Sequence, residues 1–301
     1  MNNVIETNQL SKRYGSRTVV DSLNLRVPQG CVYGFLGPNG SGKSTTMKML
    51  LSLIRPTHGD VQIMGQPMTR ESRRRLLRHI GSLIEAPPGY GHLTGQENMR
   101  LVQRLLDLPP QQVDWAVDTV RLTDQMDKRV RNYSLGMKQR LGIALALAKQ
   151  PELLILDEPT NGLDPAGIEE IRDLLRHLAA SGVTVMVSSH LLGEIDKTAT
   201  ELGILSEGHM IFQGTREELM TASTPDVIIE SSDPRYVQSV LGQHRNSRTD
   251  GRATRIANVD ERSTAQVVST IVHAGIDVFE VRRDEQSLED VFMDLTKDGG
   301  L

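Results

Sequence analysis

A glycine-rich run at positions 37–45 has the residue types and spacing that bind phosphate. It matches the pattern G-x-x-x-x-G-K-[ST] and lies between a predicted strand and a predicted helix. Glycines let the backbone wrap closely around a phosphate, so that amide groups and the helix N-terminus face its oxygens. The side chains of Lys43 and Ser44 are expected to reach the β- and γ-phosphates and to bind Mg²⁺, respectively. The sequence therefore predicts a nucleoside triphosphate site formed by Gly37, Pro38, Asn39, Gly40, Ser41, Gly42, Lys43, Ser44 and Thr45.

A second chemical segment, LLILDEP at 153–159, follows the lysine by more than a hundred residues. An apolar strand that ends in Asp157 places a carboxylate where it can hold the Mg²⁺ shell. The adjacent Glu158 could orient or deprotonate the attacking water. The spacing of the glycine-rich run is not G-x-G-x-x-G, so NAD or FAD is not expected. Together the two segments predict hydrolysis of a nucleotide.

Short apolar runs alternate with longer helical patterns around these segments and must position them. Residues 31–37, 153–157 and 183–189 are typical of buried parallel strands. Helices are expected at 43–53, 165–180 and 191–197, a region at about 94–148 is mostly helical, and the opening residues predict antiparallel strands. The expected fold class is α/β with a mainly parallel core sheet, an antiparallel β subdomain and a helical subdomain.

Charge and composition narrow the class of protein. The 301 residues carry a net charge of −4, which gives no general attraction to nucleic acid or anionic lipid. The single cysteine, Cys31, cannot form an internal disulfide, which favours a reducing cytoplasm. The most apolar stretches are far shorter than the roughly 20 residues that cross a bilayer. We therefore expect a cytoplasmic chain that does not bind nucleic acid and does not span a membrane itself.

The last part of the chain differs in charge from the rest. Residues 221–301 contain 9 basic and 14 acidic residues, a net charge of −5, whereas the remainder carries +1. We place a domain boundary at this change, with one domain over 1–220 and an accessory domain over 221–301. The accessory domain is expected to be α+β, with strands at 227–230, 253–259 and 276–282 and helices at 234–241, 263–274 and 287–295.

Residues 3–220 resemble the ATP-binding subunits of ABC (ATP-binding cassette) transporters. The segment YSLGMKQR at 133–140 is similar to the family signature, and NGLD at 161–164 is similar to its D-loop. His190 follows a predicted strand where the family has a switch histidine, and Tyr14 is similar to an aromatic residue that stacks on adenine. The resemblance implies ATP and Mg²⁺ as ligands, catalytic roles for Lys43, Glu158 and His190, ATP contacts by Tyr14, Ser134 and Gly136, and a D-loop role for Asp164.

One departure narrows the resemblance further. The strand predicted over HIGSLIEAP at 79–87 ends at Glu85, where most relatives have a glutamine that touches Mg²⁺. A carboxylate is also an acceptable ligand for this hard cation, so Glu85 is expected to join Ser44 and Asp157 in binding Mg²⁺. A glutamate here, with an acidic tail that contains SLEDVF at 287–292, resembles the bacitracin and lantibiotic export ATPases.

The resemblance implies an ATPase subunit of a bacterial exporter of a peptide antibiotic or a similar amphipathic compound. It implies a homodimer that sandwiches two ATP molecules, because the signature of one subunit meets the phosphate-binding loop of the other. It also implies separately encoded membrane permease subunits, with this chain bound peripherally at the inner face of the membrane. Two alternatives stay open: an ABC ATPase of the translation or DNA-repair type without a transport role, and a regulatory module that binds ATP without hydrolysing it.

Overall fold

The chain divides into two compact units, with the division after Arg216. The computed structural model describes residues 2–85, 88–190, 192–195, 198–222, 226–241, 247–257, 259–284 and 291. The boundary expected after residue 220 falls inside a helix, α8 (Arg216–Ala222), which runs through the point where the composition changes. Within the described ranges there is no helix that is long and apolar enough to span a bilayer.

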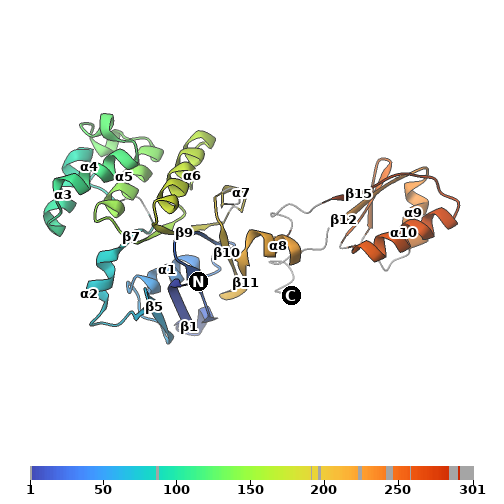
Figure 1. Cartoon of the computed structure of the whole chain (residues 1–301), viewed down its shortest axis with the longest axis horizontal. Coiled ribbons are helices and arrows are strands. Elements are labelled where there is room, and N and C mark those ends of the chain that lie inside the picture. The colour runs from blue at the N-terminus through green and yellow to red at the C-terminus, as the bar shows by residue number, and fades with distance from the viewer. Residues whose placement is uncertain are drawn as a thin grey trace. The chain divides into compact units, whose positions relative to one another are not determined.

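A six-stranded sheet organises the first unit (Figure 1). Its order is β11-β10-β4-β9-β8-β7, in which all neighbours from β10 to β7 are parallel and β11 pairs antiparallel with β10. Because parallel strands end at the same edge, the loops that follow β4, β7, β8 and β9 meet there. The strands are β4 (Val32–Leu36), β7 (Ile80–Leu83), β8 (Leu153–Asp157), β9 (Thr184–Ser189), β10 (Glu201–Ser206) and β11 (His209–Thr215).

A second, antiparallel sheet covers one side of the first unit. It has the order β2-β1-β5-β6, and β3 also pairs with β1. Helix α1 (Lys43–Leu50) contacts strands of both sheets, and its Met47 is fully buried in the core that they share. The strands are β1 (Asn3–Tyr14), β2 (Arg17–Leu23), β3 (Arg26–Pro28), β5 (His58–Ile63) and β6 (Gln66–Pro67).

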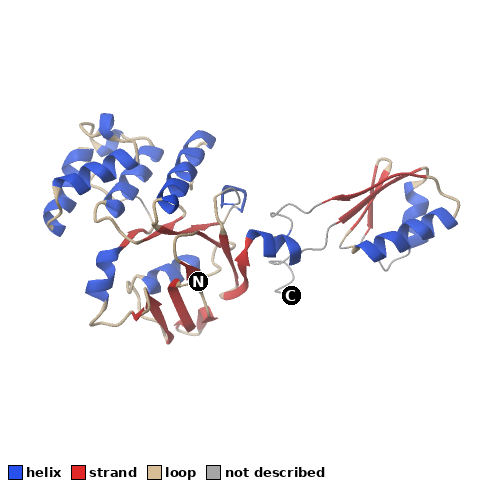
Figure 2. Cartoon of the chain, in the orientation of Figure 1, coloured by secondary structure: helices blue, strands red, loops and turns tan. Residues whose placement is uncertain are grey.

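Helices cover the other side of the six-stranded sheet (Figure 2). Helix α3 begins with a capping box in which the Thr94 and Glu97 side chains bond each other's backbone N–H groups. Helix α5 is largely buried and packs on β7 and α4. The helices on this side are α3 (Gly95–Leu106), α4 (Pro110–Thr119), α5 (Leu135–Leu147), α6 (Pro165–Ala180) and α7 (Leu192–Ile195), with 3₁₀ turns at Thr123–Gln125 and Val130–Asn132. Helix α2 (Arg73–Leu76) and the 3₁₀ turn Leu77–His79 pack instead on the core shared with the antiparallel sheet.

The second unit is a small α+β domain with its own core. Its strands form an antiparallel sheet in the order β13-β14-β12-β15, and Val227 and Ile229 of this sheet pack against α9 and α10. The order of elements along the chain is β-α-β-β-α-β. They are β12 (Asp226–Ser231), α9 (Pro234–Leu241), β13 (Ser247–Asp250), β14 (Ala253–Ile256), α10 (Glu261–His273) and β15 (Val278–Asp284).

The α/β fold with a mainly parallel core sheet is confirmed, and the differences lie at element ends. The strand expected over 79–87 is wrong in length, because β7 ends at Leu83 and Glu85 has a positive φ of 67° that turns the chain. Helix α1 ends at Leu50 rather than at residue 53. Strand β13 was not expected, because SRTD has no apolar run. The helix expected at 287–295 lies outside the described residues, apart from Val291.

Candidate nucleotide-binding and hydrolysis site

The phosphate-binding loop connects the end of β4 to the start of α1, and its glycines permit a backbone that other residues would obstruct. Gly37 has a φ of 156°, and a Cβ built on it would lie 2.2 Å from the Leu205 carbonyl oxygen. Gly42, the residue that precedes α1, has a φ of 108°, and a Cβ there would lie 2.7 Å from the Val19 carbonyl oxygen. The loop conformation therefore depends on glycine at these two positions.

Lys43 directs its ammonium group into the loop itself. Nζ donates to the carbonyl oxygens of Gly37 (2.7 Å) and Pro38 (3.3 Å), and it lies 3.6 Å from Oε1 of Glu158. The side chain is 6% exposed. Burial lowers the pKa of Lys43, whereas the nearby carboxylates of Glu158 and Asp157 act in the opposite direction. The site thus holds a partly desolvated cation whose charge suits a phosphate oxygen.

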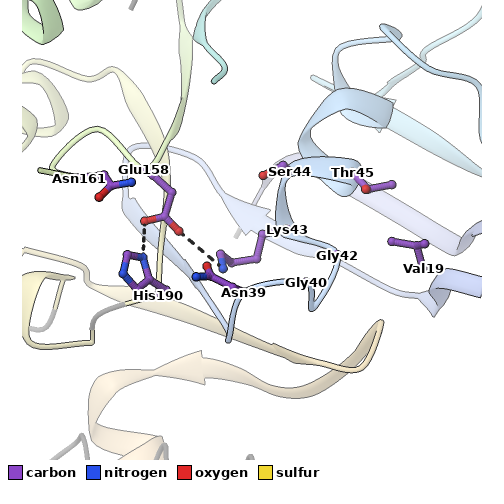
Figure 3. A pocket seen from close by; sticks show the side chains of 10 residues that line it. All are labelled: Val19, Asn39, Gly40, Gly42, Lys43, Ser44, Thr45, Glu158, Asn161 and His190. Carbon is purple, nitrogen blue, oxygen red and sulfur yellow. Dashed lines mark hydrogen bonds and ion pairs between the residues drawn. The ribbon is translucent and has the colours of Figure 1, made fainter. Parts of the chain in front are cut away.

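Glu158 is the centre of the hydrogen-bonded group opposite the loop (Figure 3). Its Oε2 lies 2.7 Å from Nδ1 of His190, while its Oε1 faces Lys43. An ionised carboxylate only accepts hydrogen bonds, so Nδ1 supplies the hydrogen and Nε2 points elsewhere. Strand β8 ends at Asp157, and Glu158 has a φ of 50°, in the left-handed region. Such strained backbone conformations concentrate at functional sites.

A buried serine holds the two neighbouring carboxylate residues. The Ser188 hydroxyl donates to Oδ1 of Asp157 (2.6 Å) and accepts from the backbone N–H of Glu158 (2.9 Å). Ser188 is fully buried on β9, and Asp157 is 6% exposed on the adjacent β8, where the two residues are register partners. The hydroxyl therefore fixes the Asp157 carboxylate and the turn at Glu158 together.

These residues surround one cavity of about 380 Å³, within the usual range of roughly 300–1,000 Å³ for small-molecule sites. The lining combines a cation, hydroxyls, backbone amides of a glycine-rich loop and a carboxylate, a donor set that fits a triphosphate. In the part of the chain that the structure describes, the buried hydroxyl of Ser41, within this loop, has no hydrogen-bond partner. The lining residues are Val19, Asn39, Gly40, Gly42, Lys43, Ser44, Thr45, Glu158, Asn161 and His190.

The other residues singled out in the sequence lie outside this lining. Tyr14 is 50% exposed, at the end of β1, and Nζ of Lys12 lies 5.0 Å from the centroid of its ring. Glu85 is 66% exposed and forms an ion pair with Lys48 of α1. This bond raises the pKa of Lys48. Ser44 is thus the member of the expected Mg²⁺ set that lines the cavity, while Asp157 bonds Ser188 and Glu85 bonds Lys48.

The signature and D-loop residues serve locally as helix caps. Ser134 precedes α5, and its Oγ accepts from the Met137 N–H (3.2 Å). Gly136 lies in the first turn of α5, and a Cβ there would come 3.8 Å from Leu163. Asp164 caps α6, with Oδ1 accepting from the Gly167 N–H (2.9 Å). The structure therefore places the N-terminus of α5 beside the D-loop and does not bring Ser134 or Gly136 into the cavity.

Sequence reasoning missed three contributors. Val19 lines the cavity from β2, outside the motifs of the sequence, and Ser188 is a serine in an apolar strand. Lys48 lies beyond the glycine-rich pattern, and its partner Glu85 follows the end of β7 in another part of the sequence. Lys43 and Lys48 lie five residues apart, a spacing that does not put them on one helix face, so none of these three residues carries a recognisable pattern in the sequence.

Comparison with known proteins gives the same assignment along nearly the whole chain. A family model described as ABC transporter matches residues 20–161, and one described as AAA domain, putative AbiEii toxin, Type IV TA system matches residues 129–196. The chain is 39% identical to the bacitracin transport ATP-binding protein BcrA of Bacillus licheniformis, over 99% of both chains. It is 44% identical to the lantibiotic transport ATP-binding protein SrtF of Streptococcus pyogenes, over 70% of this chain and 90% of that protein.

A solved structure agrees with this assignment. The structure of cbiO1 from Clostridium perfringens, described as part of the ABC transporter complex cbiONQ, has a TM-score of 0.68 and 26% sequence identity. The match covers 73% of this chain and 92% of cbiO1. With the geometry of the phosphate-binding loop and its facing carboxylates, these similarities identify the chain as a member of the ABC transporter ATP-binding family, whose members hydrolyse ATP.

Proposed function

We propose that this chain is the ATP-hydrolysing subunit of a bacterial ABC exporter that moves a peptide antibiotic or a similar amphipathic compound. The observation that carries the proposal is the placement of the Glu158 carboxylate between Lys43 and His190, at the mouth of the glycine-rich loop. A carboxylate in this position can orient or deprotonate a water molecule that attacks the terminal phosphate. The names of the bacitracin and lantibiotic transport relatives support the choice of substrate class.

Residues of the cavity and residues near it have separate roles in this proposal. The amides of the loop and the Lys43 ammonium hold the phosphates, and His190 keeps the Glu158 carboxylate in orientation through the 2.7 Å bond. Mg²⁺, when bound, would neutralise phosphate charge, and the Ser44 hydroxyl and the Asp157 carboxylate have the chemistry to hold it. Glu85 can join them by exchanging its ion pair with Lys48, and Tyr14 offers an exposed aromatic face for the adenine.

The proposal includes a homodimer in which each cavity is completed by the second copy. Ser134 and Gly136 do not line the cavity that contains Lys43, although the N-terminus of α5 presents backbone amide groups of a kind that suits phosphate. A second copy that supplied this helix end would complete the set of phosphate donors. ATP then favours the closed dimer, and hydrolysis favours its opening.

Membrane permease subunits are the remaining partners in the proposal. We infer that they are separate polypeptides and that this chain binds them from the cytoplasmic side. The docking region we expect is the exposed Glu85 and the helices of residues 94–148, since Glu85 lies at the end of β7 and α5 packs on that strand. Movement of the helical region could therefore be transmitted through this contact.

A Glu158→Gln variant tests the hydrolytic role. The amide keeps the size and polarity of the side chain but loses the basic oxygen, so we expect ATP binding to persist while turnover stops. Gel filtration with Mg-ATP should then show a dimer. Glu152→Gln is the matched control, because Glu152 is a half-exposed carboxylate paired with His79 outside the cavity. A Glu158→Gln protein that stays monomeric and still hydrolyses ATP would contradict the proposal.

The transport role needs a separate measurement. We expect the chain to co-purify with a multi-spanning membrane protein encoded beside it and to hydrolyse ATP faster in that complex. An active ATPase that binds no membrane protein and confers no resistance to any amphipathic antibiotic would favour a non-transport ABC ATPase.

A further inference from the structure

The second unit has an exposed strand at one edge of its sheet. Strand β15 pairs with β12, and in the part of the chain that the structure describes no strand lies on its other side (Figure 1). Its five interior residues, 279–283, are all exposed, including Phe279 (64%) and Val281 (40%). An edge of this length with exposed apolar side chains offers a row of backbone groups to another strand.

In the described part of the second unit, two of the charged residues on β15 form ion pairs, and two do not. Arg283 pairs with Glu261 of α10 at 3.0 Å, and Asp284 pairs with Arg255 of β14. By contrast, Glu280 and Arg282 have no ion-pair partner among the described residues. Glu280 also lies directly opposite Glu230 of β12, and like charges in such cross-strand positions repel.

Glu280 and Arg282 share the face of the sheet that does not carry the helices. Val227 and Ile229 pack in the helix-side core, so the alternation of side chains puts Ile228 and Glu230 on the other face. Their register partners on β15 are Arg282 and Glu280, which therefore lie on that face as neighbours two residues apart. The strand thus presents one acid and one base, side by side, at an open edge.

We propose that β15 pairs antiparallel with β15 of a second copy of this chain, so that two second units share one eight-stranded sheet. A twofold axis perpendicular to the sheet keeps each side chain on its own face, so a residue of the strand must sit at the axis. If the axis passes at Glu280, the two Glu280 side chains face each other, and if it passes at Arg282, the two Arg282 side chains face each other. Both registers oppose like charges. Centring on Val281 instead sets each Glu280 opposite Arg282 of the other copy.

In this register the unpaired charges of Glu280 and Arg282 and the exposed side chain of Val281 all gain partners from the second copy. Cβ atoms of directly opposed residues lie about 4.5–5.5 Å apart, which is within reach of a glutamate–arginine ion pair. The arginine from the second copy would also relieve the repulsion between Glu280 and Glu230, and the two Val281 side chains would cover each other. The twofold axis therefore places the acidic residue of each strand opposite the basic residue of the other strand.

The proposed contact between second units differs from the ATP-dependent homodimer proposed above, because nucleotide does not control it. It involves no phosphate or metal ligand, so it forms without nucleotide. It is smaller than a standard protein interface of about 1,600 Å², so alone it would be weak. Its effect would be to keep two chains near each other and so raise the effective concentration for cassette closure. The second unit then acts as a tether between ATPase subunits.

Charge reversal in the full-length chain tests the proposed register. Sedimentation equilibrium without nucleotide and with EDTA excludes closure through ATP. We expect the wild type to self-associate, and Glu280→Arg or Arg282→Glu alone to weaken that association by roughly tenfold or more, because each places like charges opposite each other. The double variant, Glu280→Arg with Arg282→Glu, should restore it. Arg248→Glu, on β13 at the opposite edge, is the matched control and should change nothing.

Mixing the two single variants shows whether their weaker association comes from like charges in the proposed register or from a folding defect. In a mixed dimer Glu280→Arg in one chain faces Arg282→Glu in the other, so every opposed pair is again complementary. We therefore expect the mixture to associate more tightly than either variant alone. A wild type that is monomeric throughout the concentration series, or a double variant and a mixture as weak as the single variants, would overturn the proposal. Neither result would affect dimerisation of Glu158→Gln by Mg-ATP.

Discussion

Replacing Ser188 by alanine removes one hydroxyl that bonds both halves of the Asp157–Glu158 pair. The lost bond to Asp157 is 2.6 Å long, charge-assisted and buried. Such a bond contributes about 1.5–3 kcal/mol, and a buried N–H left without a partner, here that of Glu158, costs about 1–3 kcal/mol. Allowing for partial relaxation, we expect the free energy of unfolding to fall by about 3 kcal/mol.

Urea unfolding followed by Trp115 fluorescence measures this loss in the correct unit, because the single tryptophan of the chain lies in α4 of the first unit. At roughly 2–4 °C per kcal/mol for a domain of this size, the melting temperature should also fall by about 6–12 °C. Ser181→Ala is the control. It removes a 2.8 Å bond from an exposed serine to the neutral Leu178 carbonyl, which should cost less than about 1 kcal/mol.

The same substitution should also slow ATP turnover. Without the hydroxyl, the Asp157 carboxylate and the turn at Glu158 lose their shared anchor, so we expect the turnover rate to fall at least about tenfold. ATP affinity should change little, because the loop and Lys43 are untouched. If Ser188→Ala has the stability and the turnover of Ser181→Ala, then Ser188 does not hold the two carboxylate residues.

Three further outcomes follow from the geometry of the first unit. Lys43→Ala should reduce steady-state hydrolysis below about a tenth of wild type, since the cavity loses its cation, and turnover above that level would contradict the role of the loop. Glu85→Gln breaks an exposed ion pair, so it should change stability by less than about 1 kcal/mol and leave ATP binding by the isolated chain intact; transport by the assembled system should fall more than the ATPase rate. Burial raises the pKa of Cys31 to about 12 from an ordinary value of 9.0, so at pH 8 its alkylation should be at least about a hundredfold slower in the folded than in the urea-unfolded chain, and equal rates would show an accessible thiolate.

The parts of the site that are contiguous in the sequence could be predicted from it. The loop at 37–45 and the Asp157–Glu158 pair are recognisable because a few adjacent residues on one strand end do the chemistry, and the apolar runs predicted the strands that hold them. Ser188 was not recognisable, because a serine in the apolar run at 183–189 has no pattern until β8 and β9 pair in register. Val19 lines the cavity from β2, and nothing in the sequence around it marks it as a site residue.

The end of strand β7 and the existence of strand β13 could not be predicted from the local sequence either. Strand β7 stops at Leu83 and the chain turns at Glu85, whose exposed side chain pairs with Lys48 on α1. Strand β13 has the residues of a turn or loop, and it is a strand because β14 offers it an edge. Long-range pairing, rather than local preference, therefore makes β13 a strand.

Lys43 and His190 hold Glu158 from two sides, and the two contacts are not equivalent. The ammonium–carboxylate separation is 3.6 Å, whereas the imidazole contact is 2.7 Å. An incoming phosphate oxygen is negatively charged, so it attracts the Lys43 ammonium, which already donates to two loop carbonyls, and repels the Glu158 carboxylate. We therefore expect a phosphate that attracts Lys43 to free Oε1 of Glu158 while Oε2 stays bound to His190. The carboxylate is left oriented by one partner and with one free oxygen, which is the arrangement that a base for an attacking water requires.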